Sequence, residues 1–276
     1  MRRRPRGKVR ALTVYAVAYL VFLYAPIVMI PLFSLNDSIY VAFPLKGFTG
    51  RWYAGLLADD RLQEAFVNSL EIGLLAAAIA TAAGTLTAYA LARRQVAWPR
   101  AVAAVALAPL VIPGVILGIA LLIVVNLIGL GPSLTAVLLG HVCLCLPLTI
   151  MVMKGRFAAY SAAIEEAAMD LGADEWTTLR RISLPIAMPG IVSCLMLSFT
   201  TSFDEFIVSF FLVGTKSTLP LFLWSQLRFP NQLPLMLALG SLILLASGAL
   251  VLLAEAIRRR GLGAGAEPPV LVAADV

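Results

Sequence analysis

The stretch EEAAMDLGADEWTTLRRISLP, residues 165–185, is a charged segment that separates two long apolar runs. The polar interval as a whole covers residues 154–185, whereas a plain connection between bundled helices needs only about 2–8 residues. Its acidic and later basic side chains are Glu165, Glu166, Asp170, Asp174, Glu175, Arg180 and Arg181. The length and charge of this interval predict a folded element between the two runs.

Two short helices are predicted inside this interval. Small and apolar residues recur at the spacing of an amphipathic helix, at Ile164, Ala167, Ala168 and Leu171. The acidic residues lie on the other face of this helix. Gly172 suits the end of this helix, because glycine readily adopts the left-handed conformation found there. Asp174 suits the N-cap of a second helix over residues 174–181. One face of these helices is free to dock a soluble partner; a solvated loop without a partner is the alternative.

The composition is that of a membrane protein. Of the 276 residues, 61% are hydrophobic and 13% are charged, and the mean hydropathy is +0.94. Soluble domains are about 45–50% apolar and about 25% charged. The net charge of +6 comes from basic residues at the ends of apolar runs, which argues against nucleic-acid binding. Cys143, Cys145 and Cys194 lie in apolar stretches and lack the spacing of a metal or redox site.

Six apolar segments are long enough to cross a bilayer, which takes about 20 residues. We predict transmembrane helices at residues 11–33, 65–92, 101–128, 134–153, 187–213 and 233–257. The first follows the basic stretch RRRPRGKVR but is too long for a signal-peptide core, so we expect it to stay attached. The predicted fold class is an all-α integral membrane protein with six transmembrane helices.

The basic residues predict the orientation, because Lys and Arg close to the ends of a span favour the cytoplasm. Most of the 21 basic residues are cytoplasmic if the N-terminus is inside; the exceptions are Lys46, Arg51, Arg61, Lys216 and Arg228. Both termini and the 154–185 loop are then cytoplasmic. The predicted organisation is a basic N-terminus (1–10), a six-helix domain (11–260) and a disordered cytoplasmic tail (261–276).

The 154–185 loop resembles the signature of one transporter family. It matches, in residue type and spacing, the EAA…G…I-x-L-P motif of the permease subunits of binding-protein-dependent (type I) ABC importers, at Glu166, Ala167, Ala168, Gly172, Ile182, Leu184 and Pro185. The resemblance implies a coupling helix, which sits in a cleft of a cytoplasmic ATPase and transmits its closure to the membrane helices. The coupling residues that it implies are Glu166, Ala167, Ala168, Asp170, Gly172, Leu184 and Pro185.

The resemblance also implies the partners and the location. Such an importer contains two copies of the cytoplasmic ATPase, a second permease subunit and a periplasmic or extracellular substrate-binding protein. The permease pair is expected to be a heterodimer that spans the inner membrane of a bacterium several times. No cofactor is implied for this chain, because ATP and magnesium are bound by the ATPase. The expected mechanism is alternating access, driven by ATP through the 154–185 loop.

Nearly the whole chain resembles the spermidine/putrescine permeases in particular. The stretches that carry this resemblance are YAPIVMIPLFSLND (24–37), GFTGRWYAGLL (47–57), NSLEIG (68–73), LSFTTSFDEFIVSFFLVG (197–214) and TLPLFLWSQLR (218–228). One stretch departs from the pattern: PLMLALG, residues 234–240, has Leu235 and Leu237 where polyamine permeases show an acidic residue and an asparagine. Polyamines are therefore the predicted cargo, and related small solutes stay open.

Asp204 and Glu205, with Phe203, are the candidate residues of the substrate path. Acidic side chains in an apolar run cost about 2.5–3.5 kcal/mol each on insertion, so they are expected to face a cavity, a partner or an interface. The resemblance places a matching acidic pair in polyamine permeases, where a cationic substrate explains it. A pairing with a basic or hydroxyl group of the second permease subunit is the alternative.

Two other function classes are considered. A self-sufficient secondary carrier or channel would use Asp204 and Glu205 as its ion site, but such a carrier has no need of a docking helix. An intramembrane enzyme is set aside, because the sequence offers no nucleophile–base pair and no metal-ligand constellation. His141, the only histidine, fits a buried and hydrogen-bonded residue better than a ligand or a proton relay.

Overall fold

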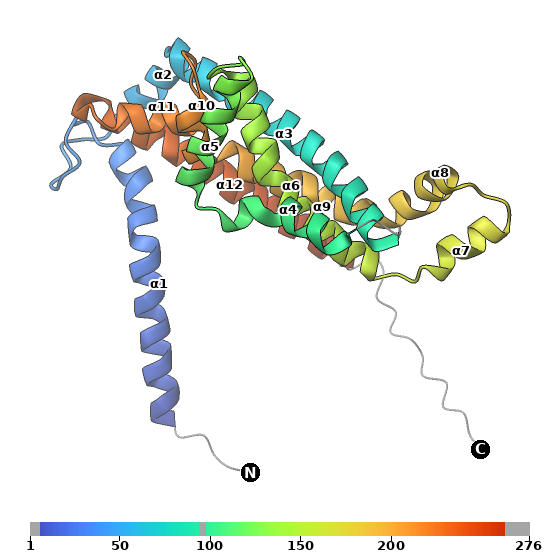
Figure 1. Ribbon diagram of the computed structural model, residues 1–276. Helices are drawn as coiled ribbons and strands as arrows, with labels where there is room; N and C mark the ends of the chain where they lie inside the picture. Colours follow the sequence, from blue (N-terminus) through green and yellow to red (C-terminus); the bar gives the residue numbers. More distant parts are fainter. Residues whose placement is uncertain (1–5, 94–97, 263–276) are drawn as a thin grey trace. The chain divides into compact units, whose positions relative to one another are not determined.

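The computed structural model describes residues 6–93 and 98–262 (Figure 1). Within these residues the chain is helical, and its β-structure is limited to one isolated bridge between Asn36 and Phe48. The contacts divide the chain into two compact units, which are described separately: Met1–Asp59 with Gln226–Val276, and Asp60–Ser225. The all-α prediction is confirmed for the described residues.

The first unit combines the two ends of the chain. Its helices are α1 (Arg6–Ser34), α2 (Arg51–Leu57), the 3₁₀ turn η2 (Pro230–Gln232) and α12 (Leu233–Leu262). α12 packs against both α1 and α2. The hydroxyl of Tyr53 lies 2.6 Å from Ser34 Oγ and 3.2 Å from Ser241 Oγ, so it joins the three helices.

The second unit contains the other helices. They are α3 (Asp60–Arg93), α4 (Pro99–Val111), α5 (Gly114–Leu127), α6 (Leu134–Ala158), α7 (Ala163–Asp170), α8 (Glu175–Thr178), the π-helix η1 (Leu179–Ser183), α9 (Leu184–Phe203), α10 (Ile207–Leu212) and α11 (Leu219–Gln226). α3 packs along α6 and α9, and these two also contact each other. These three long helices form the centre of the unit.

Small residues on α3 allow this close packing. Ala76, Ala80 and Ala88 are fully buried. At Gly84 a Cβ atom would lie 2.6 Å from the Cβ of Thr149 on α6, so a side chain there would force the helices apart. Helices of membrane proteins commonly use small residues in this way, because dispersion contacts between backbones replace the hydrophobic effect.

The helix predicted over residues 101–128 is two helices in the structure. α4 and α5 meet at an angle of 111° across Ile112 and Pro113. Ile112 has the extended conformation (φ −77°, ψ 127°), which the proline ring of the next residue favours over the helical one. The predicted segment is therefore a bent pair of helices, with the bend at a proline.

The helix predicted over residues 187–213 is also interrupted. α9 ends at Phe203, and α10 begins at Ile207. In the gap, Glu205 Oε1 accepts a hydrogen bond from the backbone N–H of Val208, at 2.9 Å, so it caps the start of α10. The acidic pair therefore lies at a helix break and not inside a helix.

Fewer spans are found in the described residues than the six predicted. Four helical stretches are long and apolar enough to cross a membrane: Leu12–Ser34, Asp60–Arg93, Leu134–Ala158 and Glu175–Phe203. The bent pair α4–α5 makes a fifth if it is counted as one span, and the apolar stretch Pro230–Ala246 is shorter. Residues 1–5 of the predicted N-terminal segment and 263–276 of the predicted tail lie outside the described residues.

Candidate functional site

The 154–185 loop forms a helical elbow at one end of the second unit. α7 and α8 lie beyond the ends of α6 and α9 and are joined by a short loop (yellow, Figure 1). We call residues 163–178 the elbow. α8 continues through η1 into α9 without a break, so the second predicted helix does not end at residue 181.

The two predicted cap residues of the elbow are confirmed. Gly172 has φ +92°, a left-handed conformation, and its N–H donates to the carbonyl of Met169 at 2.9 Å. The next N–H, of Ala173, donates to the carbonyl of Ala168 at 3.0 Å, which completes a Schellman motif. Asp174 is the N-cap of α8, because its Oδ1 accepts from the N–H of Thr177 at 3.2 Å. Hydrogen bonds from the side chain of Thr177 and then from its backbone N–H lower the pKa of Asp174.

The predicted sidedness of α7 is wrong for one acid. Glu165 is only 5% exposed, whereas the motif residues next to it face outward. Glu166, Ala167, Asp170, Gly172 and Pro185 are exposed, and Ala168 and Leu184 are partly buried. Two residues of the predicted apolar face are exposed to solvent: Leu171 is 90% exposed, and Ile164 is also exposed. The packing therefore selects a different face of α7 from the one that hydropathy predicts.

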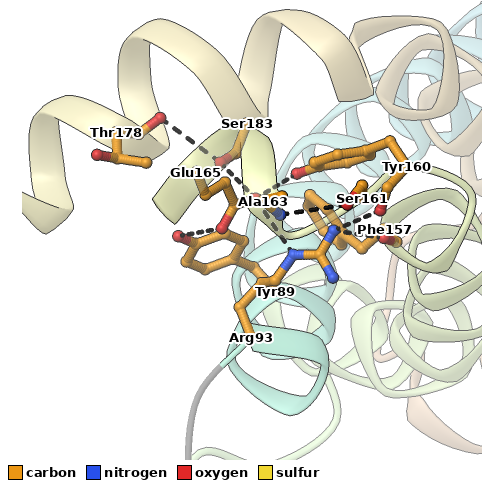
Figure 2. Close-up of polar contacts among 9 residues, drawn as sticks. All are labelled: Tyr89, Arg93, Phe157, Tyr160, Ser161, Ala163, Glu165, Thr178 and Ser183. Carbon is orange, nitrogen blue, oxygen red and sulfur yellow. Dashed lines mark hydrogen bonds and ion pairs between the residues drawn. The ribbon is translucent and has the colours of Figure 1, made fainter. Parts of the chain in front are cut away.

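The buried carboxylate of Glu165 is the centre of a polar cluster (Figure 2). Three donors reach Glu165 Oε1: the hydroxyl of Tyr160 at 2.6 Å, that of Ser183 at 2.9 Å and the Nε of Arg93 at 3.2 Å. The hydroxyl of Tyr89 lies 3.4 Å from Oε2. We call these five residues the Glu165 cluster.

Arg93 is itself held in place by backbone groups. Its NH2 group donates to the carbonyls of Phe157, at 2.7 Å, and Tyr160, at 3.0 Å (Figure 2). Its guanidinium carbon lies 4.6 Å from the centre of the Tyr160 ring, a cation–π distance. The side chains of Arg93 and Glu165 are 12% and 6% exposed, so this ion pair is shielded from water. Loss of one partner of such a pair leaves a buried charge, at a cost of about 3–5 kcal/mol.

The cluster keeps Glu165 ionised. Burial raises the pKa of its carboxyl, but the hydrogen bonds of three donors and the charge of Arg93 outweigh burial, and the pKa lies below its usual range. Burial and the neighbouring carboxylate raise the pKa of Tyr160, so its hydroxyl keeps the proton that it donates. A stable negative charge is thus fixed on the buried side of the elbow.

The outer surface of the elbow is apolar and acidic. Trp176, on α8, is 62% exposed, and Leu171 of the connecting loop is exposed as well. A pocket of about 460 Å³ is lined by Tyr89, Asp174, Glu175, Trp176 and Leu179. Trp176 directly follows the exposed Asp174 and Glu175 in the chain, so apolar and acidic side chains are exposed together at the start of α8.

The candidate substrate-path residues occupy the break between α9 and α10. Asp204 is exposed, while Glu205 and Phe203 are partly buried. Phe203 packs against Phe199 and Phe66, with ring centres 5.6 and 6.2 Å apart. The cap that Glu205 provides for α10 gives its carboxylate a structural task, which leaves Asp204 as the more accessible acid.

His141 is buried and hydrogen-bonded, as predicted. Its Nδ1 lies 2.7 Å from Ser202 Oγ on α9, and its Nε2 lies 2.9 Å from Ser209 Oγ on α10. The hydroxyl of Ser209 also lies 3.1 Å from the carbonyl oxygen of Glu205. His141 on α6 therefore joins the two helices on either side of the break. Within the part of the chain that the structure describes, no group of three His, Cys, Asp or Glu residues is arranged to hold a metal ion.

Comparison with protein families identifies this arrangement. Residues 80–261 match the family described as binding-protein-dependent transport system inner membrane component. The chain belongs to this family. It is a multi-pass inner-membrane permease, a component of a transport system and not an enzyme.

Individual permeases are similar along most of their length. The spermidine/putrescine transport system permease protein of Haemophilus influenzae is 35% identical over 240 residues, 87% of this chain and 93% of that protein. The putrescine transport system permease protein of Escherichia coli K12 is 36% identical over 231 residues, 81% and 82% of the two chains. These values confirm the predicted family.

The permease fold is found in solved structures as well. A chain of a bacterial ABC transporter that imports the acidic polysaccharide alginate has a TM-score of 0.71, with 17% identity over 94% of this permease and 99% of that chain. A second structure of an alginate ABC transporter, in complex with an alginate-bound periplasmic protein, has a TM-score of 0.67 at 17% identity. The likeness extends to the fold.

Sequence reasoning missed most of the Glu165 cluster. Tyr89 and Arg93 are one helical turn apart at the end of a long apolar run, a pattern that indicates a polar cluster at that end of the permease helix. The pattern does not name the partner, because Glu165 is 72 residues away along the chain. Tertiary packing brings these groups together: α3 lies along α6, and α7, which carries Glu165, follows α6 in the chain.

Proposed function

We propose that this protein is the membrane-spanning permease subunit of an ATP-driven importer whose cargo is a polyamine, spermidine or putrescine, or a related small solute. The cargo is inferred from the relatives that are 33–36% identical over most of the chain and that are named for spermidine and putrescine transport. The chain contributes a path and a coupling surface, and the energy comes from a partner.

The elbow is the observation that carries this proposal. It is two capped helices whose outer surface exposes Leu171 and Trp176 beside acidic groups, while Glu165 attaches its inner side to the membrane helices. A mere connection needs neither caps nor exposed apolar side chains. The arrangement suits a surface that a cytoplasmic ATPase grips and moves.

The coupling residues proposed for this surface are those of the sequence motif: Glu166, Ala167, Ala168, Asp170, Gly172, Leu184 and Pro185. ATP binding closes a dimer of ATPase subunits, which draws the elbow inward and opens the path toward the substrate-binding protein; hydrolysis resets it. ATP and magnesium are bound by the ATPase, and this chain needs no cofactor. A second, distinct permease subunit completes the path.

Six spans with both termini in the cytoplasm are the proposed topology. Four long helices and the bent pair α4–α5 provide five, and α12, with 30 residues, is the sixth. α12 exceeds the length of about 20 residues that a bilayer crossing requires. The distribution of basic residues supports a cytoplasmic elbow.

A cationic cargo gives the exposed Asp204 a role. Asp204 is the C-cap residue of α9, and its exposed carboxylate is free of the capping task that Glu205 has, so it can attract a cation. Leu235 and Leu237 lack the polar groups that polyamine permeases carry at these places. Asp204→Asn should therefore reduce uptake without disturbing the docking of the ATPase.

The competing function is a self-sufficient secondary carrier or channel. The family match and the relatives offer it no support. Its distinguishing property would be transport that survives the loss of ATP and of Glu166.

The first experiment measures uptake of labelled putrescine and spermidine by cells that express this chain with its partner subunits, beside cells that carry Glu166→Lys. In the variant, a positive charge faces the ATPase surface that fits the exposed acids of the elbow. Contacts between like charges cost several kcal/mol. We expect uptake in the wild type and a loss of roughly tenfold or more in the variant.

Each result has a definite meaning. Uptake that Glu166→Lys abolishes supports both the coupling surface and the polyamine cargo. No polyamine uptake by an assembled complex rejects the cargo, and uptake that ignores Glu166→Lys rejects the coupling role of the elbow.

A further inference from the structure

The Glu165 cluster joins the elbow to three membrane helices at a single carboxylate. Arg93 and Tyr89 lie on α3, Tyr160 directly follows α6, and Ser183 lies in η1 at the root of α9 (Figure 2). α3, α6 and α9 are the helices that form the centre of the second unit. A displacement of Glu165 therefore acts on the ends of all three.

We propose that Glu165 is the positioning residue through which movement of the elbow is transmitted to α3 and α9. The inference rests on the proposed function, in which a partner ATPase moves the elbow. On this account Glu165 touches neither the cargo nor the nucleotide. It acts by holding α7 to α3 and α9, the helices that α7 must move.

The other contacts of α7 leave this task to Glu165. Within the described residues, no other side chain of α7 makes a hydrogen bond or an ion pair with another helix. Leu171 and Gly172, just beyond α7, are exposed, and a Cβ at Gly172 would meet no atom within 4 Å. Among the residues that the structure describes, the side-chain hydrogen bonds from α7 to other helices thus all come from Glu165.

The attachment to α3 is stiff. The Arg93 guanidinium donates to Glu165 and to two backbone carbonyls at once, so it cannot rotate without breaking several hydrogen bonds. Charge-assisted hydrogen bonds are roughly twice as strong as neutral ones, and shielding from water strengthens them further. A push on α7 is therefore passed on to α3 and is not absorbed by a loose side chain.

The attachment to α9 runs through an irregular helix. Ser183 Oγ lies 2.9 Å from Glu165 Oε1 and 3.5 Å from the carbonyl of Thr178, and its single proton favours the shorter bond. Ser183 is the last residue of the π-helix η1, and π-helices within α-helices are commonly found at functional sites. Glu165 thus holds the point at which α8 passes into α9.

The test uses the assembled complex in proteoliposomes and measures the number of putrescine molecules transported per ATP hydrolysed. Glu165→Gln keeps the shape of the side chain but removes its charge. We expect the ratio to fall roughly 3–30-fold, the range that mutations along a coupling route produce. ATP hydrolysis and co-purification of the ATPase should persist, because the outer surface of the elbow is unchanged.

The ratio separates transmission from folding. A purely structural role of Glu165 would lower the yield of complex, and transport and hydrolysis would fall together with an unchanged ratio. Glu64→Gln is the matched control, since Glu64 is an exposed acid of α3 that pairs with Lys216 at 3.5 Å. This control should keep the wild-type ratio.

Two milder variants cover the case in which Glu165→Gln does not assemble. Tyr160→Phe and Ser183→Ala each remove one hydrogen bond to the carboxylate and leave the charge pair intact. Ser183→Ala acts only on the link to α9. Each is expected to lower the ratio roughly twofold to fivefold.

The outcomes distinguish this inference from the function on which it rests. A wild-type complex that does not transport, or a Glu166→Lys complex that transports normally, overturns the proposed function and the inference with it. If those two behave as expected but the Glu165→Gln complex, or both milder variants in its place, keep the wild-type ratio, only the role of Glu165 is overturned.

Discussion

Two neighbouring residues with the same side chain differ in their environment. Glu165 is buried against Arg93, whereas Glu166 is exposed on the outer side of α7. Successive residues of a helix point about 100° apart, so one acid of such a pair can face the protein and the other the solvent. The pair thus places one buried, paired carboxylate and one exposed carboxylate within one helical turn.

Acidification should weaken the anchor. A carboxyl whose pKa is lowered by folding stabilises the folded chain above the unfolded pKa, and this contribution is lost as the pH falls through the folded pKa. We expect the wild type to lose more thermal stability than Glu165→Gln as the pH falls from about 7 to below 4.5, the ordinary value for this carboxyl. Melting temperatures in detergent at both pH values measure this, and a parallel loss in the two proteins would contradict it.

His141 should stabilise the break between α9 and α10. Its replacement by alanine leaves the buried hydroxyl of Ser202 without this partner and removes one of the two contacts of the Ser209 hydroxyl, and an unsatisfied buried group costs about 1–3 kcal/mol. We expect a lower midpoint of unfolding in detergent for His141→Ala. Asn126→Ala is the control, because the exposed side chain of Asn126 donates to the carbonyl of Leu122 in its own helix; equal midpoints for both variants would exclude the structural role.

Among the elements, the elbow is defined by local signals. The Schellman motif ends α7 at Gly172, and Asp174 starts α8 two residues later. These contacts are made within a few residues of each other and need little help from the rest of the fold. They give the loop a fixed shape, which a surface for a partner protein requires.

Two glycine-to-alanine changes should have opposite effects. A Cβ at either Gly172 or Gly155 would meet open space, so only the backbone differs. Gly172 has φ +92°, which an alanine adopts at a cost of about 1–2 kcal/mol, whereas Gly155 is inside α6, where alanine is better by about 0.5–1 kcal/mol.

Hydrogen exchange of the elbow amides measures this difference. Exchange should become about 5–30-fold faster in Gly172→Ala, because local opening is easier by the energy of the strained residue. Gly155→Ala should not accelerate it. Equal exchange in the two variants would show that the left-handed residue does not limit the opening of the elbow.

For the whole molecule, the topology can be tested by labelling. In a background without native cysteines, single cysteines at exposed positions should react with a membrane-impermeant maleimide according to side. We expect Lys46→Cys and Thr215→Cys to react in intact cells, and Arg100→Cys and Lys154→Cys only after permeabilisation, since basic residues flank cytoplasmic ends. Labelling of Lys154→Cys in intact cells would reverse the orientation and exclude a cytoplasmic elbow.

Some of the structure could be predicted because it depends on local or additive properties. The hydropathy of a segment is the sum over its residues, so long apolar segments identify a membrane protein from the sequence. The caps at Gly172 and Asp174 follow from the preferences of single residues. The motif from Glu166 to Pro185 indicated the transporter family for the same reason: it can be read along the chain.

The tertiary structure decided what depends on residues that are distant in sequence. The burial of Glu165 requires Arg93, 72 residues away, and the break at residues 204–206 is held by His141 on another helix. A hydropathy pattern places Glu165 on the solvent side, because it scores a carboxylate as exposed whatever its partners are. The sequence alone determined the membrane class and the family, while packing determined where the long helices break and which charge is buried, since a buried charge is stable only where a partner from another helix meets it.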